Sequence, residues 1–97
     1  MIRSFRGAGT EDAFNGSDTK AARRVCAPTI LRAAQRKLES LDSAESLVDL
    51  RIPPGNRLEA LKGDRLGQHS IRINDQYRIC FIWTAAGPTD VEIVDYH

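Results

Sequence analysis

The last third of the chain constrains the fold most, because it reads as strands joined by tight turns. Apolar and polar side chains alternate over residues 69–74 and again over 77–84, and a final strand-like run spans 90–96. Asn74-Asp75-Gln76 and Ala86-Gly87-Pro88 separate these runs as short turns. Consecutive strands joined by such turns pair antiparallel, and apolar residues on both faces of 77–84 predict that this strand is central.

The residues ahead of these strands carry helical signals. Five apolar residues recur at spacings of three and four after Pro28, which predicts a helix over residues 28–42: Ile30, Leu31, Ala34, Leu38 and Leu41. Thr10 can cap a shorter helix over 10–15, residues 16–20 read as a loop, and residues 2–5 as a first strand. Strands grouped after helices predict an α+β fold, with two N-terminal helices packed on one face of a small antiparallel sheet.

Composition is that of an ordinary globular domain, and we expect residues 1–97 to form one domain. No apolar run approaches the roughly 18 residues of a membrane-spanning helix, and the N-terminus lacks the apolar block of a secretory signal. Cys26 and Cys80 are too few for a disulfide framework and too isolated for a metal site. We therefore expect a cytoplasmic protein without metal, cofactor or membrane association.

The formal net charge of +1 conceals basic segments. Residues 20–37 contain no acidic residue but several cationic ones: Lys20, Arg23, Arg24, Arg32, Arg36 and Lys37. Such a surface can meet a nucleic acid or an acidic protein, although a charge run is more often only a solvated face.

Residues with catalytic chemistry stand together at the end of the last strand, where Asp95, Tyr96 and His97 follow one another. Imidazole titrates near neutrality, and a neighbouring carboxylate and phenol can orient it or share in proton transfer. Arg78 begins the preceding strand, so antiparallel pairing brings its guanidinium to the same edge, where it can stabilise charge on a phosphate. The same residues also fit a polar chain end in which Arg78 only pairs with Asp95.

Other candidates carry weaker signals. Lys62 and Arg65 lie on a glycine-containing turn, where they can touch a backbone phosphate or remain solvated. Glu59 either faces the same cleft or is a surface charge, and His69 is more typical of a half-buried structural histidine. No phosphate-binding glycine loop, serine-nucleophile motif or metal-ligand spacing is present in the sequence.

Four stretches together resemble the HigB-type toxins of the RelE/ParE superfamily of bacterial toxin–antitoxin systems: residues 53–65, 67–74, 76–81 and 91–97. The resemblance covers nearly the whole chain and is strongest from residue 53 to the end. It implies a RelE-like twisted antiparallel sheet with two N-terminal helices. It also implies a metal-independent endoribonuclease (an mRNA interferase) that cleaves messenger RNA in the ribosomal A site, through attack of the 2′-hydroxyl on the adjacent phosphate. Inhibition of translation and growth arrest would follow.

The resemblance also implies site residues. Asp95, Tyr96 and His97 match the terminal catalytic set of the family, and Arg78 matches the arginine that stabilises the scissile phosphate. His97 or Tyr96 would then transfer the proton while Asp95 orients.

RNA-binding residues are expected among the basic side chains: Lys62, which matches the family's turn, with Arg65, Arg72 and Arg36. Glu59 stands where some relatives carry a catalytic histidine. Glutamate can act as a base but not as a cation beside a phosphate, so we expect a supporting role for Glu59 and a milder or differently organised nuclease.

The partners that the resemblance implies are a HigA-like helix-turn-helix antitoxin, the 70S ribosome and messenger RNA, with operator DNA bound only through the antitoxin complex. An alternative within the superfamily is a non-catalytic toxin that inhibits a protein target such as DNA gyrase. A third is a regulatory module that acts together with its antitoxin on operator DNA, through the basic helix at 28–42. The terminal triad favours the nuclease.

Overall fold

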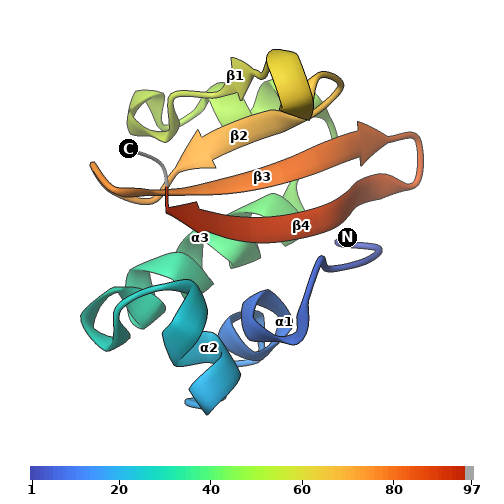
Figure 1. The fold of residues 1–97 in the computed structure, drawn as a ribbon. Helices are drawn as coiled ribbons and strands as arrows, with labels where there is room; N and C mark the ends of the chain where they lie inside the picture. Colours follow the sequence, from blue (N-terminus) through green and yellow to red (C-terminus); the bar gives the residue numbers. More distant parts are fainter. Residues whose placement is uncertain (96–97) are drawn as a thin grey trace.

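The computed structural model describes residues 1–95, and within them four strands form one antiparallel sheet in the order β1-β2-β3-β4 (Figure 1). The strands are β1 (Glu59–Ala60), β2 (His69–Arg72), β3 (Tyr77–Thr84) and β4 (Gly87–Asp95). All neighbouring pairs are antiparallel, and β3 lies between β2 and β4. The predicted antiparallel sheet and its central strand are therefore confirmed.

Three α-helices precede the sheet in this part of the chain, where two were predicted: α1 (Ala8–Phe14), α2 (Lys20–Val25) and α3 (Leu31–Ser43). Short 3₁₀ turns lie at Pro28–Ile30, Leu47–Arg51, Pro54–Asn56 and Gly63–Arg65. The unpredicted helix, α2, has only six residues and no apolar stripe in its sequence. It is stabilised by the Thr19 hydroxyl, which accepts a hydrogen bond of 3.1 Å from the Ala22 N–H, and by burial of Ala22.

Thr10 does not cap α1, contrary to the prediction. It lies inside the helix with 1% of its surface exposed, and its hydroxyl oxygen accepts a hydrogen bond of 3.0 Å from the Ile93 N–H of β4. The side chain therefore joins the first helix to the last strand.

The predicted first strand is also reduced, to a single parallel bridge between Phe5 and Val91. Ser4 accepts a backbone hydrogen bond of 3.1 Å from Val91, and its side chain accepts one of 2.9 Å from the Asp90 N–H. Asp90 adopts a φ of 50°, which takes the edge of β4 out of regular strand geometry. This kink interrupts regular strand pairing between β4 and residues 2–5.

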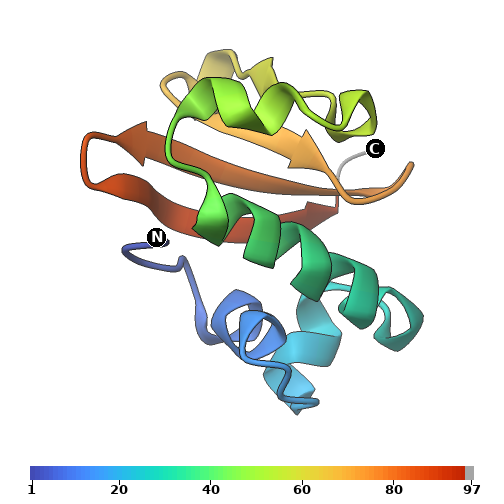
Figure 2. The same cartoon turned by 180° about the vertical axis from the view of Figure 1, so that it is seen from behind.

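Helix α3 crosses one face of the sheet, as the view from behind shows (Figure 2), and its buried side chains form the core with the sheet. Buried side chains of α3 meet those of β2, β3 and β4: Ala34, Leu38, Leu41, Ile71, Ile79, Phe81, Val91 and Ile93. Helices α1 and α2 lie beyond the β4 side of the sheet, and no helix of residues 1–95 covers the opposite face of β2, β3 and β4 (Figures 1 and 2). We call this opposite face the open face.

Candidate functional site

The strand register determines which side chains share the open face. Side chains alternate between faces along a strand, and partners in register point to the same side. One row across the sheet is Glu59, Ser70, Cys80 and Glu92, and the next row is Arg72, Arg78 and Val94. A carboxylate and a guanidinium from different strands are thus brought together on the face that no helix covers.

Arg78 lies at the centre of this arrangement. Its Nη1 donates a hydrogen bond of 3.3 Å to the Ser70 hydroxyl and lies 3.6 Å from Oε1 of Glu59. The side chain of Arg78 is 18% exposed and that of Glu59 is 52% exposed. The guanidinium is therefore largely sheltered, while the carboxylate that faces it remains open to solvent.

A second ion pair crosses the open face beside Cys80. Arg65 lies 3.3 Å from Oε1 of Glu92 and donates a hydrogen bond of 3.1 Å to Gln68. Burial raises the pKa of the Cys80 thiol, and the nearby Arg65 guanidinium only partly opposes this effect. The raised pKa keeps the Cys80 thiol protonated near neutral pH, which lowers its reactivity as a nucleophile.

Of the other predicted RNA-binding residues, some lie on or near the open face and one does not. Arg72 stands directly opposite Arg78 in register and forms an ion pair with Asp75. Lys62 is exposed and precedes the 3₁₀ turn Gly63–Arg65, next to β1 and Glu59. Arg36 is exposed on α3, which packs on the opposite face, so the structure does not bring it to the open face.

Asp95 ends β4 opposite Tyr77, one register position from Arg78. Its carboxylate accepts a hydrogen bond of 3.0 Å from the Gln76 side chain. Tyr96 and His97, the other members of the predicted terminal set, lie outside the described residues.

His69 has a packing role in this structure. It pairs with Phe81 in register on the core side, with ring centroids 6.3 Å apart and an interplanar angle of 24°. This placement agrees with the half-buried structural histidine expected from the strand pattern.

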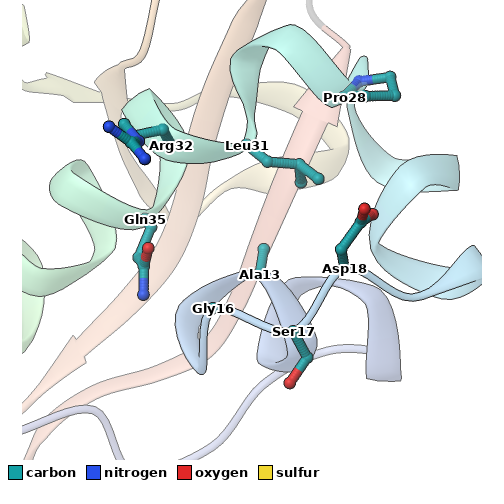
Figure 3. A pocket seen from close by; sticks show the side chains of 8 residues that line it. All are labelled: Ala13, Gly16, Ser17, Asp18, Pro28, Leu31, Arg32 and Gln35. Atoms are coloured by element: carbon teal, nitrogen blue, oxygen red, sulfur yellow. The ribbon is translucent and has the colours of Figure 1, made fainter.

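A separate cavity of about 290 Å³ lies on the helical side of the molecule (Figure 3). It opens between α1, the loop after it and the start of α3, and its walls include Asp18, Arg32 and Gln35. Asp18 is paired with Arg23 at 2.9 Å. None of the predicted site residues lines this cavity, so the open face is the better candidate for chemistry.

Within residues 1–95, no three or more histidine, cysteine or acidic side chains cluster in a way that could hold a metal ion. No helix in this part of the chain is long and apolar enough to cross a membrane.

Ser70 and Glu92 are site residues that the sequence interpretation did not single out. For Ser70, the sequence signal was the alternation along residues 69–74, which places Ser70 on the same side of the strand as Arg72. The partnership between Arg65 and Glu92 joins residues 27 positions apart and needs the register of the folded sheet.

A family model and one named relative point to the same family. The family model described as "RelE-like toxin of type II toxin-antitoxin system HigB" matches residues 3–97. Toxin HigB-1 of Vibrio cholerae serotype O1 is 53% identical over 60 residues, which are 62% of this chain and 63% of that protein. An uncharacterized protein of Haemophilus influenzae is 38% identical over 52 residues, 54% of this chain and 52% of its own length. The matched regions thus span less than two thirds of either relative.

One solved structure is similar to this chain over its whole length. The YoeB-YefM complex from Staphylococcus aureus contains a chain that matches with a TM-score of 0.60, covering 100% of this chain and 98% of that one. The sequence identity is 14%, so this likeness bears on the fold alone. It confirms the RelE-like α+β architecture predicted from the sequence.

Proposed function

The chain belongs to the HigB-like family of RelE-like toxins of type II toxin–antitoxin systems, and we propose that it is a ribosome-dependent endoribonuclease that cleaves messenger RNA in the A site. The observation that carries the proposal is the placement of Arg78. Its guanidinium lies on the open face beside the Glu59 carboxylate. A phosphate placed there meets a cation and a nearby carboxylate from another strand.

The reaction needs proton transfer and stabilisation of charge on phosphorus. The 2′-oxygen bonds to the adjacent phosphorus while the bond from phosphorus to the 5′-oxygen breaks, leaving a cyclic phosphate and a 5′-hydroxyl. A base takes the proton of the 2′-hydroxyl and an acid protonates the leaving oxygen. We assign proton transfer to His97 or Tyr96, orientation to Asp95, and stabilisation of the phosphorane to Arg78.

Glu59 takes the supporting role in this scheme. Its carboxylate lies 3.6 Å from Arg78 and is half exposed, so it can accept a proton from an RNA that lies on the open face. It also offsets part of the positive charge of Arg78, which weakens the attraction for a phosphate. Both properties fit an enzyme milder than relatives with a histidine at this position.

Positioning of the message is assigned to surrounding cations and to the ribosome. Lys62, Arg65 and Arg72 lie on or beside the open face and can contact the RNA backbone. Holding the nucleophile and phosphate in line accounts for much of a catalyst's effect. In this proposal the ribosome supplies this alignment in the A site.

We further propose a HigA-like helix-turn-helix antitoxin as the cognate partner. The Staphylococcus aureus relative in fold was solved as a complex of YoeB with YefM, which supports the expectation of a bound antitoxin here. Operator DNA would be bound through that complex, in the cytoplasm.

The test is cleavage of a defined message on stalled ribosomes, with cut positions mapped for the parent, a His97-deleted variant and Arg78→Ala. We expect A-site cuts with the parent and a loss of roughly 10²–10³-fold in rate with Arg78→Ala. Arg24→Ala, an exposed arginine of α2, is the matched control and should cleave at the parent rate. Intact message with the parent, alongside growth arrest in cells, would instead indicate a protein target such as gyrase.

A further inference from the structure

Ser70 is a buried polar residue for which the proposed reaction names no role. It lies in β2 with 0% of its surface exposed, and its hydroxyl oxygen accepts the hydrogen bond from Arg78 Nη1 at 3.3 Å. A buried hydroxyl is costly unless it is hydrogen-bonded. The bond to Arg78 satisfies it, and at the same time holds one nitrogen of the guanidinium.

The sheet register makes this contact possible. Ser70 stands opposite Cys80 on β3 and opposite Glu59 on β1, and Arg78 lies two residues before Cys80. Diagonal neighbours of this kind share a face and lie within reach of long side chains. The arginine therefore extends across β2 toward β1, so that one nitrogen meets both the hydroxyl and the carboxylate.

We propose that Ser70 is a positioning residue that sets the orientation of the Arg78 guanidinium for the scissile phosphate. The inference rests on the proposed nuclease function. A guanidinium is planar with its donors in a fixed fork, so holding one nitrogen restricts the direction of the others. Donors fixed before the reaction stabilise developing charge without the cost of reorienting.

Ser70 suits this role better than Glu59. The Glu59 carboxylate is half exposed, so solvent and salt screen its attraction for Arg78. The Ser70 hydroxyl comes from β2, inside the sheet, and is fully buried, so salt screens its contact with Arg78 much less. It does not reach the surface, so it acts through Arg78 rather than on the RNA itself.

The experiment compares Ser70→Ala and Ser70→Thr with the parent in ribosomal cleavage, recording kcat and KM separately. Ser70→Ala should lower kcat about tenfold, less than the roughly 10²–10³-fold loss expected when such a donor is removed altogether, with KM within about twofold of the parent. Ser70→Thr keeps the hydroxyl and should recover most of the rate. Thr89→Val removes a hydroxyl that donates to Ile82 on the same sheet, and is the matched control expected to leave kcat unchanged.

A second arm tests whether Ser70 acts through Arg78. In an Arg78→Lys background, which lacks the fork, Ser70→Ala should change kcat by less than about twofold. An equal loss in both backgrounds overturns the positioning role, because a packing defect would act without Arg78. The positioning role is also overturned if the parent cleaves the message and Ser70→Ala has the same kcat. If the parent itself cleaves no ribosomal message, the proposed nuclease function is refuted. The activity of the parent therefore distinguishes failure of the proposed function from failure of the positioning role.

Discussion

Replacement of Thr10 by valine should destabilise the protein although the two side chains have nearly the same shape. The Thr10 hydroxyl oxygen is the acceptor for the Ile93 N–H at 3.0 Å, and both residues are buried. Valine removes the acceptor and leaves that N–H in the interior without it. An orphaned buried donor costs about 1–3 kcal/mol.

The expected size follows from the length of the chain. In a domain of about 100 residues, each kcal/mol lowers the melting temperature by roughly 4–8 °C. A loss of about 2 kcal/mol for Thr10→Val therefore corresponds to roughly 8–16 °C. Thr10→Ser keeps the acceptor and loses only a methyl group, so it should cost about 0.8 kcal/mol.

Thermal and urea unfolding of the variants measure these differences, and amide exchange of Ile93 reports on the bond itself. Thr10→Asp tests whether position 10 is a buried site or a helix cap, because the two predict opposite effects on stability. Aspartate is a favourable cap residue, whereas a buried carboxylate at position 10 should make Thr10→Asp the least stable variant of the series. A Thr10→Val protein as stable as the parent, with unchanged exchange at Ile93, would refute the reasoning.

Three further predictions concern activity, pH and packing. Glu59→His should raise the rate of ribosomal cleavage by roughly tenfold or more, since a positioned acid or base contributes about 10²–10⁴; no gain would argue against the proposal that Glu59 makes this enzyme milder than relatives with a histidine. Burial raises the pKa of Cys26 and Cys80, so the folded protein holds these protons more tightly than the unfolded chain. The contribution of the two protonated thiols to the free energy of unfolding is then fully present below about pH 8.5 and is lost as the pH rises above this value. A Cys26→Ala/Cys80→Ala variant should show a smaller decrease in urea midpoint between about pH 8 and 10, and an equal decrease would count against it. A Cβ at Gly9 would lie 2.5 Å from the Ala21 carbonyl oxygen, so Gly9→Ala should cost about 1–3 kcal/mol in urea unfolding. Its control, Gly55→Ala, meets no atom within 4 Å and should be near neutral.

Three of the four strands of the sheet were predictable from sequence because their signals are local, whereas the two-residue strand β1 was not predicted. Alternation along 69–74 and 77–84, together with short turns, determines both the strands and their antiparallel pairing. The helix at 28–42 follows from apolar spacing, and the structure places α3 at Leu31–Ser43 after a 3₁₀ turn. Helix α2 was not predictable in this way, because a helix of six residues depends on burial of Ala22 by the surrounding fold.

The candidate site was predictable only where register follows from the turns. The proximity of Arg78 to the end of β4 could be deduced, since adjacent antiparallel strands place start beside end. The diagonal contact of Arg78 with Ser70 required the pairing of β2 with β3 at residue resolution. The position of Arg36 could not be predicted from sequence. Its charge suggested RNA binding, but charge does not tell which face of the sheet a helix covers.

The joining of the first residues to the last strand has a consequence for the order of folding. The hydrogen bonds from Asp90 to Ser4 and from Ile93 to Thr10 close loops of 86 and 83 residues. Such contacts repay their chain entropy only after residues 90–93 have been made. Helix α1 therefore packs against β4 only once these residues are available, and the open face is completed at the same step. A growing chain carries no assembled site until β4 has been made.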